Sequence, residues 1–328
     1  MVTGIGIGNG LGLLGGSYGG GGFGGQVDNS ITNDLLVVIT GQSNAVGSSF
    51  NEVDAGYSET VISSGVRRAA AFNYGTTYDE PVSGLTIIGA STTHPDGDPV
   101  VADSSNAIFN TVDDYSIAPE LIRLIQAGIP GLDEVYVVHG GVNGTQIGDH
   151  IADATYGSSA GGVWINKGGI INLINRFKEY AVDSYSPTPD EGYSAFIYWQ
   201  GESDFVEMAR GNISSADLTT RINALFSYLD TEIAPNYDSV LVIQPVYWGA
   251  YVDFGTQGEW DSAYSQIKSE YSAACASRTK YGYVDISTVL ADSASYKLTT
   301  SSAFNQALHL NPSGYYEVAQ LIATLIGL

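Results

Sequence analysis

The hydrophobic residues of this chain fall into short runs separated by polar stretches. The runs span residues 35–39, 85–88, 135–138, 195–198, 240–243 and 283–286. Each run is as long as a β-strand and mostly apolar, which is typical of parallel strands covered on both faces. We therefore predict strands at these six places.

A helical period appears between and after the later runs. Leu218, Ile222 and Leu225 recur at helical spacing after Ser215, the predicted N-cap, and a second stripe runs through residues 260–271. Asn311 is placed to cap a last helix whose first residue is a proline. Strands that alternate with helices predict an α/β fold, an open parallel sheet with helices on both faces. Ligands of such sheets bind at the carboxyl ends of the strands.

Residues 1–30 have a different composition from the rest of the chain. Thirteen glycines lie between Gly4 and Gly25, interleaved with apolar residues, and ordering such a segment alone is entropically costly. We predict two parts, a glycine-rich N-terminal arm at 1–30 and one globular domain at 31–328. The arm is either a flexible leader or a segment that joins an oligomer or a larger assembly.

Composition and charge exclude several classes of partner. The formal net charge is −23, from 35 acidic and 12 basic residues, so the chain would repel a nucleic acid backbone. No apolar run approaches the roughly 18 residues that span a bilayer, and no basic region precedes the first apolar residues, as a standard signal peptide requires. Cys275 is the single cysteine, which rules out an intrachain disulfide and the usual thiolate metal sites. We expect neither a metal nor a membrane partner.

The first strand ends in the tetrad "GQSN", residues 41–44. Gly41 allows a tight turn, and Ser43 then stands just past the strand, where open α/β sheets place their chemistry. The N–H groups of a following helix would point at the atom that this serine attacks. A serine in this position is also a common helix N-cap, so the tetrad alone leaves a nucleophile and a cap both open.

Three further motifs follow in the order "VNGTQI", "WQGESD" and "HLNPSGY". Together with "GQSN" they resemble the SGNH/GDSL hydrolase superfamily, and within it the carbohydrate acetylesterase branch related to sialate and xylan O-acetylesterases. The resemblance covers roughly residues 34–328. It implies a three-layer αβα sandwich around an open parallel, flavodoxin-like sheet, and a hydrolase that needs no cofactor.

The resemblance also implies a role for each matching residue. Ser43 matches the nucleophile, and its own backbone N–H would contribute to the oxyanion hole. Gly144 matches a second backbone donor, although Asn143 stands where the family usually has a first glycine. Gln200 matches a glutamine whose side-chain amide is the third donor, and His309 matches the catalytic base. The remaining histidines have no match, and we expect polar loop residues at His94, His139 and His150.

One family feature is missing from the last motif. Members usually carry an aspartate three residues before the histidine, and this chain has Gln306 there. A glutamine can accept a hydrogen bond from the imidazole, but it cannot stabilise the imidazolium by charge. Either the relay is a weakened Ser–His pair, or Asp285 or Glu202 substitutes for the acid, or the protein is inactive. Outside that role, we expect structural functions for Glu202 and Asp204.

These observations predict a serine esterase that removes small acyl groups, above all acetyl, from a carbohydrate. Aromatic residues near strand ends could stack on sugar rings: Tyr198, Trp199, Tyr247 and Trp248. The alternative is a virion or surface protein that keeps the fold for glycan binding or assembly without turnover. The glycine-rich arm and Gln306 favour that alternative. The expected partner is an acetylated glycan as substrate, with a possible oligomer or larger assembly formed through the glycine-rich arm, and we expect an extracellular or virion-associated location.

Overall fold

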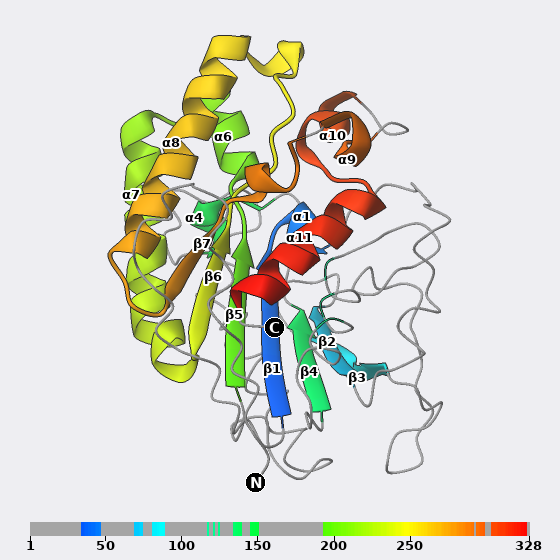
Figure 1. The fold of residues 1–328 in the computed structure, drawn as a ribbon. Helices are drawn as coiled ribbons and strands as arrows, with labels where there is room; N and C mark the ends of the chain where they lie inside the picture. The colour runs from blue at the N-terminus through cyan, green and yellow to red at the C-terminus, as the bar shows by residue number, and fades with distance from the viewer. Residues whose placement is uncertain are drawn as a thin grey trace, which may run out of the picture.

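The computed structural model describes residues 34–46, 69–74, 81–88, 117, 121, 124, 134–139, 145–150, 193–291, 293–298 and 303–326. The glycine-rich arm lies outside these residues. The described strands form one seven-stranded sheet in the order β3-β2-β4-β1-β5-β6-β7 (Figure 1). The bounds are β1 Asp34–Gly41, β2 Ala69–Tyr74, β3 Pro81–Ile88, β4 Glu134–His139, β5 Tyr193–Trp199, β6 Ser239–Ile243 and β7 Tyr281–Val284.

All neighbouring strands run parallel except β2 and β3, which pair antiparallel. The run at 85–88 is therefore the end of an antiparallel strand at the edge of the sheet, and the prediction that it is a parallel strand was wrong. The run at 283–286 is also shorter than predicted. β7 stops at Val284 because the Asp285 side chain accepts a hydrogen bond from Ser287 N–H and caps the 3-10 helix η5, Ile286–Thr288.

The helices that follow the strands begin at recognisable caps. α7, Ser215–Tyr228, has Ser214 as its N-cap, one residue before the predicted Ser215, because Ser214 and Asp217 form a capping box. α11, Pro312–Leu325, begins as predicted, with the Asn311 side chain accepting from Gly314 N–H. The other helices are α1 Ser43–Val46, α4 Ile147–His150, α6 Glu202–Ala209, α8 Gln257–Ala276, α9 Ser293–Tyr296 and α10 Ala303–Leu308. Short π and 3-10 turns lie at η2 Leu229–Ile233, η3 Ala234–Asn236 and η4 Val252–Phe254.

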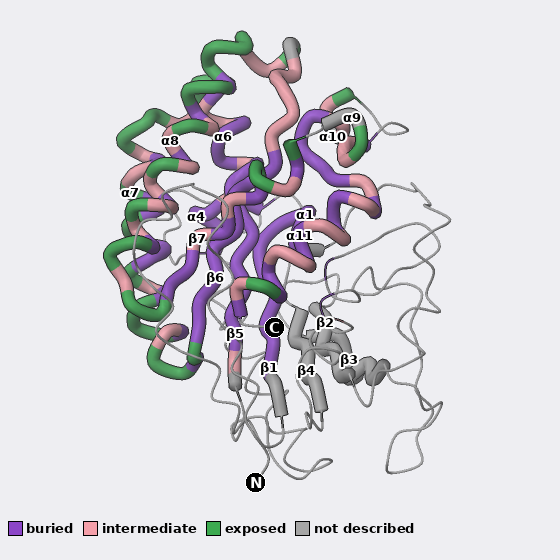
Figure 2. Tube along the Cα trace, viewed as in Figure 1, coloured by how far each residue is buried: buried purple, intermediate pink, exposed green. Residues whose placement is uncertain are grey.

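Alternate residues of the central strands face two separate cores, which makes three layers. Leu36 and Val38 of β1 pack on one side, in the core that α6, α7 and α8 cover. Val37 and Ile39 pack on the other side, in the core that α11 covers. Figure 1 shows these helices on opposite sides of the sheet, and Figure 2 shows that β6 and most of the described lengths of β1 and β5 are buried. The predicted three-layer α/β fold is confirmed.

The strand order reverses at β1, which places the carboxyl end of this strand at a switch point. The chain builds β2, β3 and β4 on one side of β1 and then crosses to build β5, β6 and β7 on the other. Connections that leave in opposite directions open a crevice at such a point, and ligands of open α/β sheets bind there.

In the part of the chain that the structure describes, no helix combines the length and the apolar character that a membrane-spanning helix needs.

Candidate active site

Gly41 shapes the turn that places Ser43 at the carboxyl end of the central strand β1. Its φ is 140°, a region that favours glycine, and a Cβ built on it would lie 1.8 Å from the carbonyl oxygen of Trp199. The same oxygen accepts a hydrogen bond from Gln42 N–H at 3.0 Å, so the turn stays against β5. Helix α1 starts at the next residue, Ser43.

Ser43 and His309 are in direct contact. Nε2 of His309 lies 2.6 Å from Oγ of Ser43, although 266 residues separate the two in the chain. Both are buried, with 8% of Ser43 and 5% of His309 exposed. The two atoms are within the hydrogen-bond reach that a nucleophile and its general base require. Trp248 holds the loop of the histidine, since its Nε1 donates to the His309 carbonyl oxygen at 3.1 Å.

The carboxylate of Glu202 binds both neighbours of Ser43. Its Oε2 accepts from Gln42 Nε2 at 2.7 Å, and its Oε1 accepts from Asn44 Nδ2 at 2.7 Å and from Val246 N–H at 2.9 Å. Only 1% of Glu202 is exposed. Burial raises the pKa of Glu202 to about 7, although the hydrogen bonds from Val246 and Asn44 act to lower it.

Asn44 connects the turn of the nucleophile with the loop of the histidine. Its Nδ2 also donates to the carbonyl oxygen of Leu308 at 2.9 Å, directly before His309 in the chain. Its Oδ1 accepts from the hydroxyl of Tyr315 at 3.1 Å, on helix α11. Sequence reasoning passed over Gln42 and Asn44, and the only signal for them was their position on either side of Ser43 in "GQSN".

Gln200 lies behind this turn. Its Nε2 donates to Gln42 Oε1 at 2.9 Å and to the Thr145 carbonyl oxygen at 2.6 Å, and Asp204 Oδ2 lies at 3.5 Å. An amide nitrogen carries two protons, and the two close contacts use both. In this arrangement Gln200 supports Gln42 and Thr145, and a substrate oxygen would have to displace one of them to bind the Gln200 amide. Gly144, the residue before Thr145, lies outside the described residues.

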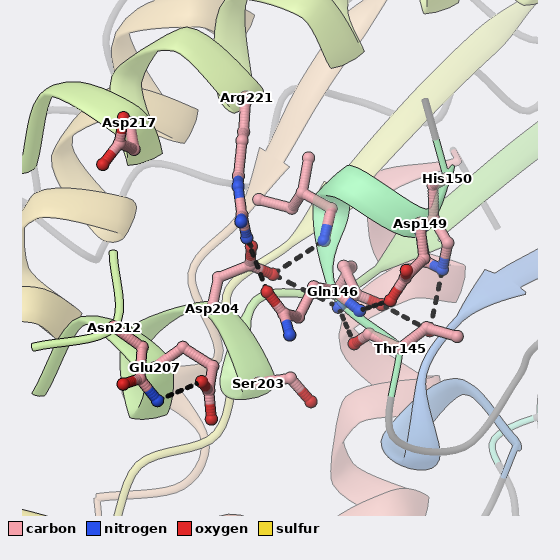
Figure 3. Close-up of polar contacts among 12 residues, drawn as sticks. Thr145, Gln146, Asp149, His150, Ser203, Asp204, Glu207, Asn212, Asp217 and Arg221 are labelled. Atoms are coloured by element: carbon pink, nitrogen blue, oxygen red, sulfur yellow. Dashed lines mark hydrogen bonds and ion pairs between the residues drawn. The ribbon is translucent and has the colours of Figure 1, made fainter. Parts of the chain in front are cut away.

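Asp204 and Arg221 form a buried ion pair beside Gln200. Arg221 Nη1 lies 3.0 Å from Asp204 Oδ1, with 4% and 0% of the two side chains exposed. Asp204 Oδ2 accepts from Ile147 N–H at 2.8 Å, and Arg221 Nη1 donates to Gln146 Oε1 at 2.6 Å (Figure 3). The pair thus anchors the segment that carries Thr145. Burial raises the pKa of Asp204 to about 6, against the charge of Arg221.

His150 is a buried core histidine, so the prediction of a polar loop residue was wrong. It lies in α4 and none of it is exposed. Its Nε2 is 2.8 Å from Thr145 Oγ1 (Figure 3), and its Nδ1 is 3.0 Å from the Tyr198 hydroxyl. Burial lowers the pKa of His150 to about 3, so the ring is neutral. His139 is also not in a loop, because it is the last residue of β4. His94 lies outside the described residues.

The carboxylates predicted as substitute acids make their contacts away from His309. Asp285 pairs with Lys268 at 3.3 Å and caps η5 through Ser287. Glu202 binds the turn of Ser43, as described above. Gln306 lies in α10, half-buried and three residues before His309. Within the described part of the chain, no group of three side chains is arranged to hold a metal ion.

Two of the four aromatic residues predicted to stack on sugars cannot do so. Tyr198 and Trp199 are fully buried because β5 is covered on both faces. Tyr247 and Trp248 follow β6 and are half-buried. The structure therefore leaves Tyr247 and Trp248 as the aromatic candidates near the site.

Comparison with known proteins supports the fold. No protein-family model and no curated protein sequence matches the chain. A crystal structure of an Arabidopsis thaliana protein is similar with a TM-score of 0.50 and 12% identity, over 89% of this chain and 97% of that one. Axe2, an acetylxylan esterase from Geobacillus stearothermophilus, aligns at 14% identity and a TM-score of 0.43, over 90% of this chain and 94% of its own. NanS aligns at 11% identity and a TM-score of 0.48, over 90% of this chain and 97% of its own. The open parallel sheet flanked by helices, implied by the resemblance to SGNH hydrolases, is the observed fold.

Proposed function

We propose that this protein is a serine esterase that removes small acyl groups, most simply acetyl, from a carbohydrate. The observation that carries the proposal is the 2.6 Å contact between Ser43 Oγ and His309 Nε2 at the switch point of the sheet. A hydroxyl needs an adjacent base to become a nucleophile at neutral pH, and a neutral imidazole is suited to that role.

The reaction would follow the acyl-enzyme route. Ser43 Oγ attacks the ester carbonyl carbon while its proton passes to His309 Nε2, which gives a tetrahedral intermediate with a negative oxygen. Collapse breaks the bond to the sugar oxygen, which takes the proton from His309. Water then attacks the acyl group with His309 again as base, and release of the acid restores Ser43.

Backbone N–H groups are our proposed donors to the negative oxygen. Ser43 N–H and Gly144 N–H are the two candidates from the motifs. In this scheme Gln200 acts through its bond to the Thr145 carbonyl oxygen, which fixes the peptide group between Thr145 and Gln146, close along the chain to Gly144. Such preorganised donors commonly contribute about 10²–10³-fold to kcat.

The carbohydrate part of the proposal comes from the resemblance of "GQSN" and "WQGESD" to carbohydrate acetylesterases. A net charge of −23 favours neutral or acetylated glycans over densely anionic ones as substrates. One observation favours a different function, a glycan-binding protein without turnover: Gln306 replaces the family aspartate and cannot stabilise an imidazolium by charge.

Acetate release from acetylated xylan and from p-nitrophenyl acetate tests the proposal. Wild type should release acetate, and Ser43→Ala and His309→Asn should each lower kcat by roughly 10³-fold or more. Ser227→Ala is a matched control, because Ser227 is exposed on α7 whereas Ser43 and His309 are buried. If wild type binds the deacetylated glycan by calorimetry but releases no acetate from any ester, the binding protein is the better description.

A further inference from the structure

Glu202 connects three segments that are distant in the sequence. It is the first residue of α6, directly after β5, and it reaches across to residues 42 and 44, 160 and 158 positions away. Its third bond, from Val246 N–H, fixes the segment after β6 to the same carboxylate. With 1% of the residue exposed, water does not compete for these oxygens.

The two side chains that Glu202 binds are the immediate neighbours of Ser43. Gln42 approaches one carboxylate oxygen and Asn44 the other, so the carboxylate holds the turn of the nucleophile from both sides. Asn44 uses its second proton for the carbonyl oxygen of Leu308, one residue before the base. A shift of the carboxylate would therefore change the position of Ser43 relative to His309.

We propose that Glu202 is a positioning residue, which sets the contact between Ser43 Oγ and His309 Nε2 by binding Gln42 and Asn44 together. The expected effects on kcat rest on the proposed esterase function. The expected change in the distance between Ser43 and His309 rests on the hydrogen bonds of Glu202 alone. Glu202 does not enter the proton transfer, because its carboxylate is committed to Gln42, Asn44 and Val246.

The role requires an ionised carboxylate, since an ionised carboxylate only accepts hydrogen bonds. A glutamine, or a protonated glutamic acid, would turn a donor toward the amide of Gln42 or Asn44 and lose one of the two contacts. The ionisable groups around Glu202 are Asp204 on α6, Tyr198 on β5 and Tyr264 and Tyr271 on α8. The tyrosines have raised pKa values and stay neutral between pH 5 and 8. Of the groups around this carboxylate, only Glu202 itself and Asp204, which is paired with Arg221, change charge in that range.

The kinetic test compares Glu202→Gln with Glu207→Gln, the same substitution on the same helix. Glu207 binds Arg210 and Asn212, away from the turn of Ser43. Glu202→Gln should lower kcat on p-nitrophenyl acetate by about 10²-fold with little change in KM, because displacing a reacting atom by about 1 Å costs this much. Glu207→Gln should keep the wild-type kcat.

The pH profile separates positioning from a general loss of stability. As pH falls, wild type should lose kcat through two protonations, of His309 and of Glu202, so the acid limb is steeper than one proton allows. Glu202→Gln removes one of these two protonations, so its acid limb should be less steep than that of wild type. If Glu202→Gln does not fold, Glu202→Asp replaces it: the shorter carboxylate cannot reach both amides, and kcat should fall by about 10-fold or more with the two-proton limb retained.

A crystal structure of the variant tests the inference even if wild type proves not to be an esterase. The Ser43 Oγ–His309 Nε2 distance should lengthen from 2.6 Å to beyond hydrogen-bond reach in Glu202→Gln, or in Glu202→Asp if only that variant folds. An unchanged distance, or a kcat within twofold of wild type in a folded variant, overturns the inference. Absence of acetate release from wild type, with the lengthened distance in the variant, rejects the esterase and leaves the positioning role standing.

Discussion

Trp248 donates the proton of its indole Nε1 to the main-chain carbonyl oxygen of His309, at 3.1 Å, and its backbone N–H donates to the Ala307 carbonyl oxygen at 2.9 Å. These two bonds join the segment after β6 to the loop that presents the base. Because the imidazole must stay within reach of Ser43, the position of this loop bears directly on the proposed chemistry.

Trp248→Phe should lower kcat on p-nitrophenyl acetate by roughly 10-fold, because a phenyl ring lacks the proton that holds the His309 carbonyl oxygen. Trp260→Phe is the matched control. Within the described residues the buried Trp260 Nε1 has no hydrogen-bond partner, so that substitution removes volume alone. It should lower the melting temperature and leave kcat near wild type. Equal kcat losses in both variants would argue against a specific role for the Trp248 bond.

Gln306→Asp should raise kcat by roughly 10-fold and move the acid limb of the pH profile to higher pH. An aspartate three residues before His309 would add a negative charge that favours the imidazolium, and each unit of pKa is a factor of ten. Glu202 and Asp285 bind other groups, so the new carboxylate would not compete with either. The measurement is kcat against pH for both proteins. A fall in kcat would mean that the amide of Gln306 has a role that a carboxylate cannot fill.

Gly41→Ala should destabilise the protein by roughly 3 kcal/mol or more, as large steric defects do. Its Cβ would lie 1.8 Å from the Trp199 carbonyl oxygen, and its φ of 140° adds strain. Gly249→Ala separates the two effects, since Gly249 has a φ of 144° with nothing within 4 Å of the added Cβ. The Gly249→Ala variant should lose only the unfolding free energy that corresponds to backbone strain, about 1–3 kcal/mol. Urea denaturation midpoints of both variants give the comparison, and equal losses would exclude the clash as the cause.

Arg221→Met should cost about 3–5 kcal/mol of unfolding free energy, because it leaves the carboxylate of Asp204 buried without its cation. The control is Arg278→Met. Arg278 Nη2 lies 2.9 Å from Asp230 Oδ2, at a distance like that of the buried pair, but 26% and 40% of those side chains are exposed. An exposed pair contributes about 1 kcal/mol or less. Chemical denaturation at pH 7.5 would measure the unfolding free energy of both variants. Similar losses in the two would contradict the expectation that the buried ion pair costs more to break than the exposed one.

His150 should make the folded protein sensitive to acid. Burial lowers the pKa of His150 from its ordinary value of 6.5 to about 3, so the folded state binds this proton at a lower pH than the unfolded state does. The contribution to stability is complete above pH 6.5 and is lost as pH falls toward 3. Denaturation of wild type and His150→Gln between pH 7.5 and 4 should show a steeper loss for wild type. Glu202 and Asp204 contribute with the opposite sign in both proteins, so the difference isolates His150. Parallel curves would exclude this role.

Much of the fold was predictable because the signals are local. Apolar runs of strand length predicted β1, β4, β5 and β6, and the stripe at 260–271 predicted α8. Strand β2 was missed, since its sequence "AAAFNY" opens with three alanines, which carry a weak β-propensity. Its antiparallel pairing with β3 is a contact between two strands, and the pattern of residues within either strand does not report the direction of its neighbour.

The site was predictable only in part for the same reason. Ser43 and His309 stand in motifs that can be read in isolation, and the structure brings them together. The bond from Gln42 to Glu202 depends on the parallel register of β1 and β5, in which Gly41 pairs with Trp199. Tyr198 and Trp199 were misassigned because their exposure depends on helices that cover both faces of β5. Such facts arise from packing between distant segments.

The reversal of strand order at β1 divides the candidate site between two parts of the chain. Ser43, Gln42 and Asn44 belong to the part that builds β1 to β4, whereas Glu202, Gln200 and His309 belong to the part that builds β5 to α11. Neither part contains both Ser43 and His309, so the proposed chemistry requires the two parts to be docked together. If Ser43 is the nucleophile, its activity would report on completed folding of the sheet, and a nascent chain that does not yet include His309 would carry an inert serine.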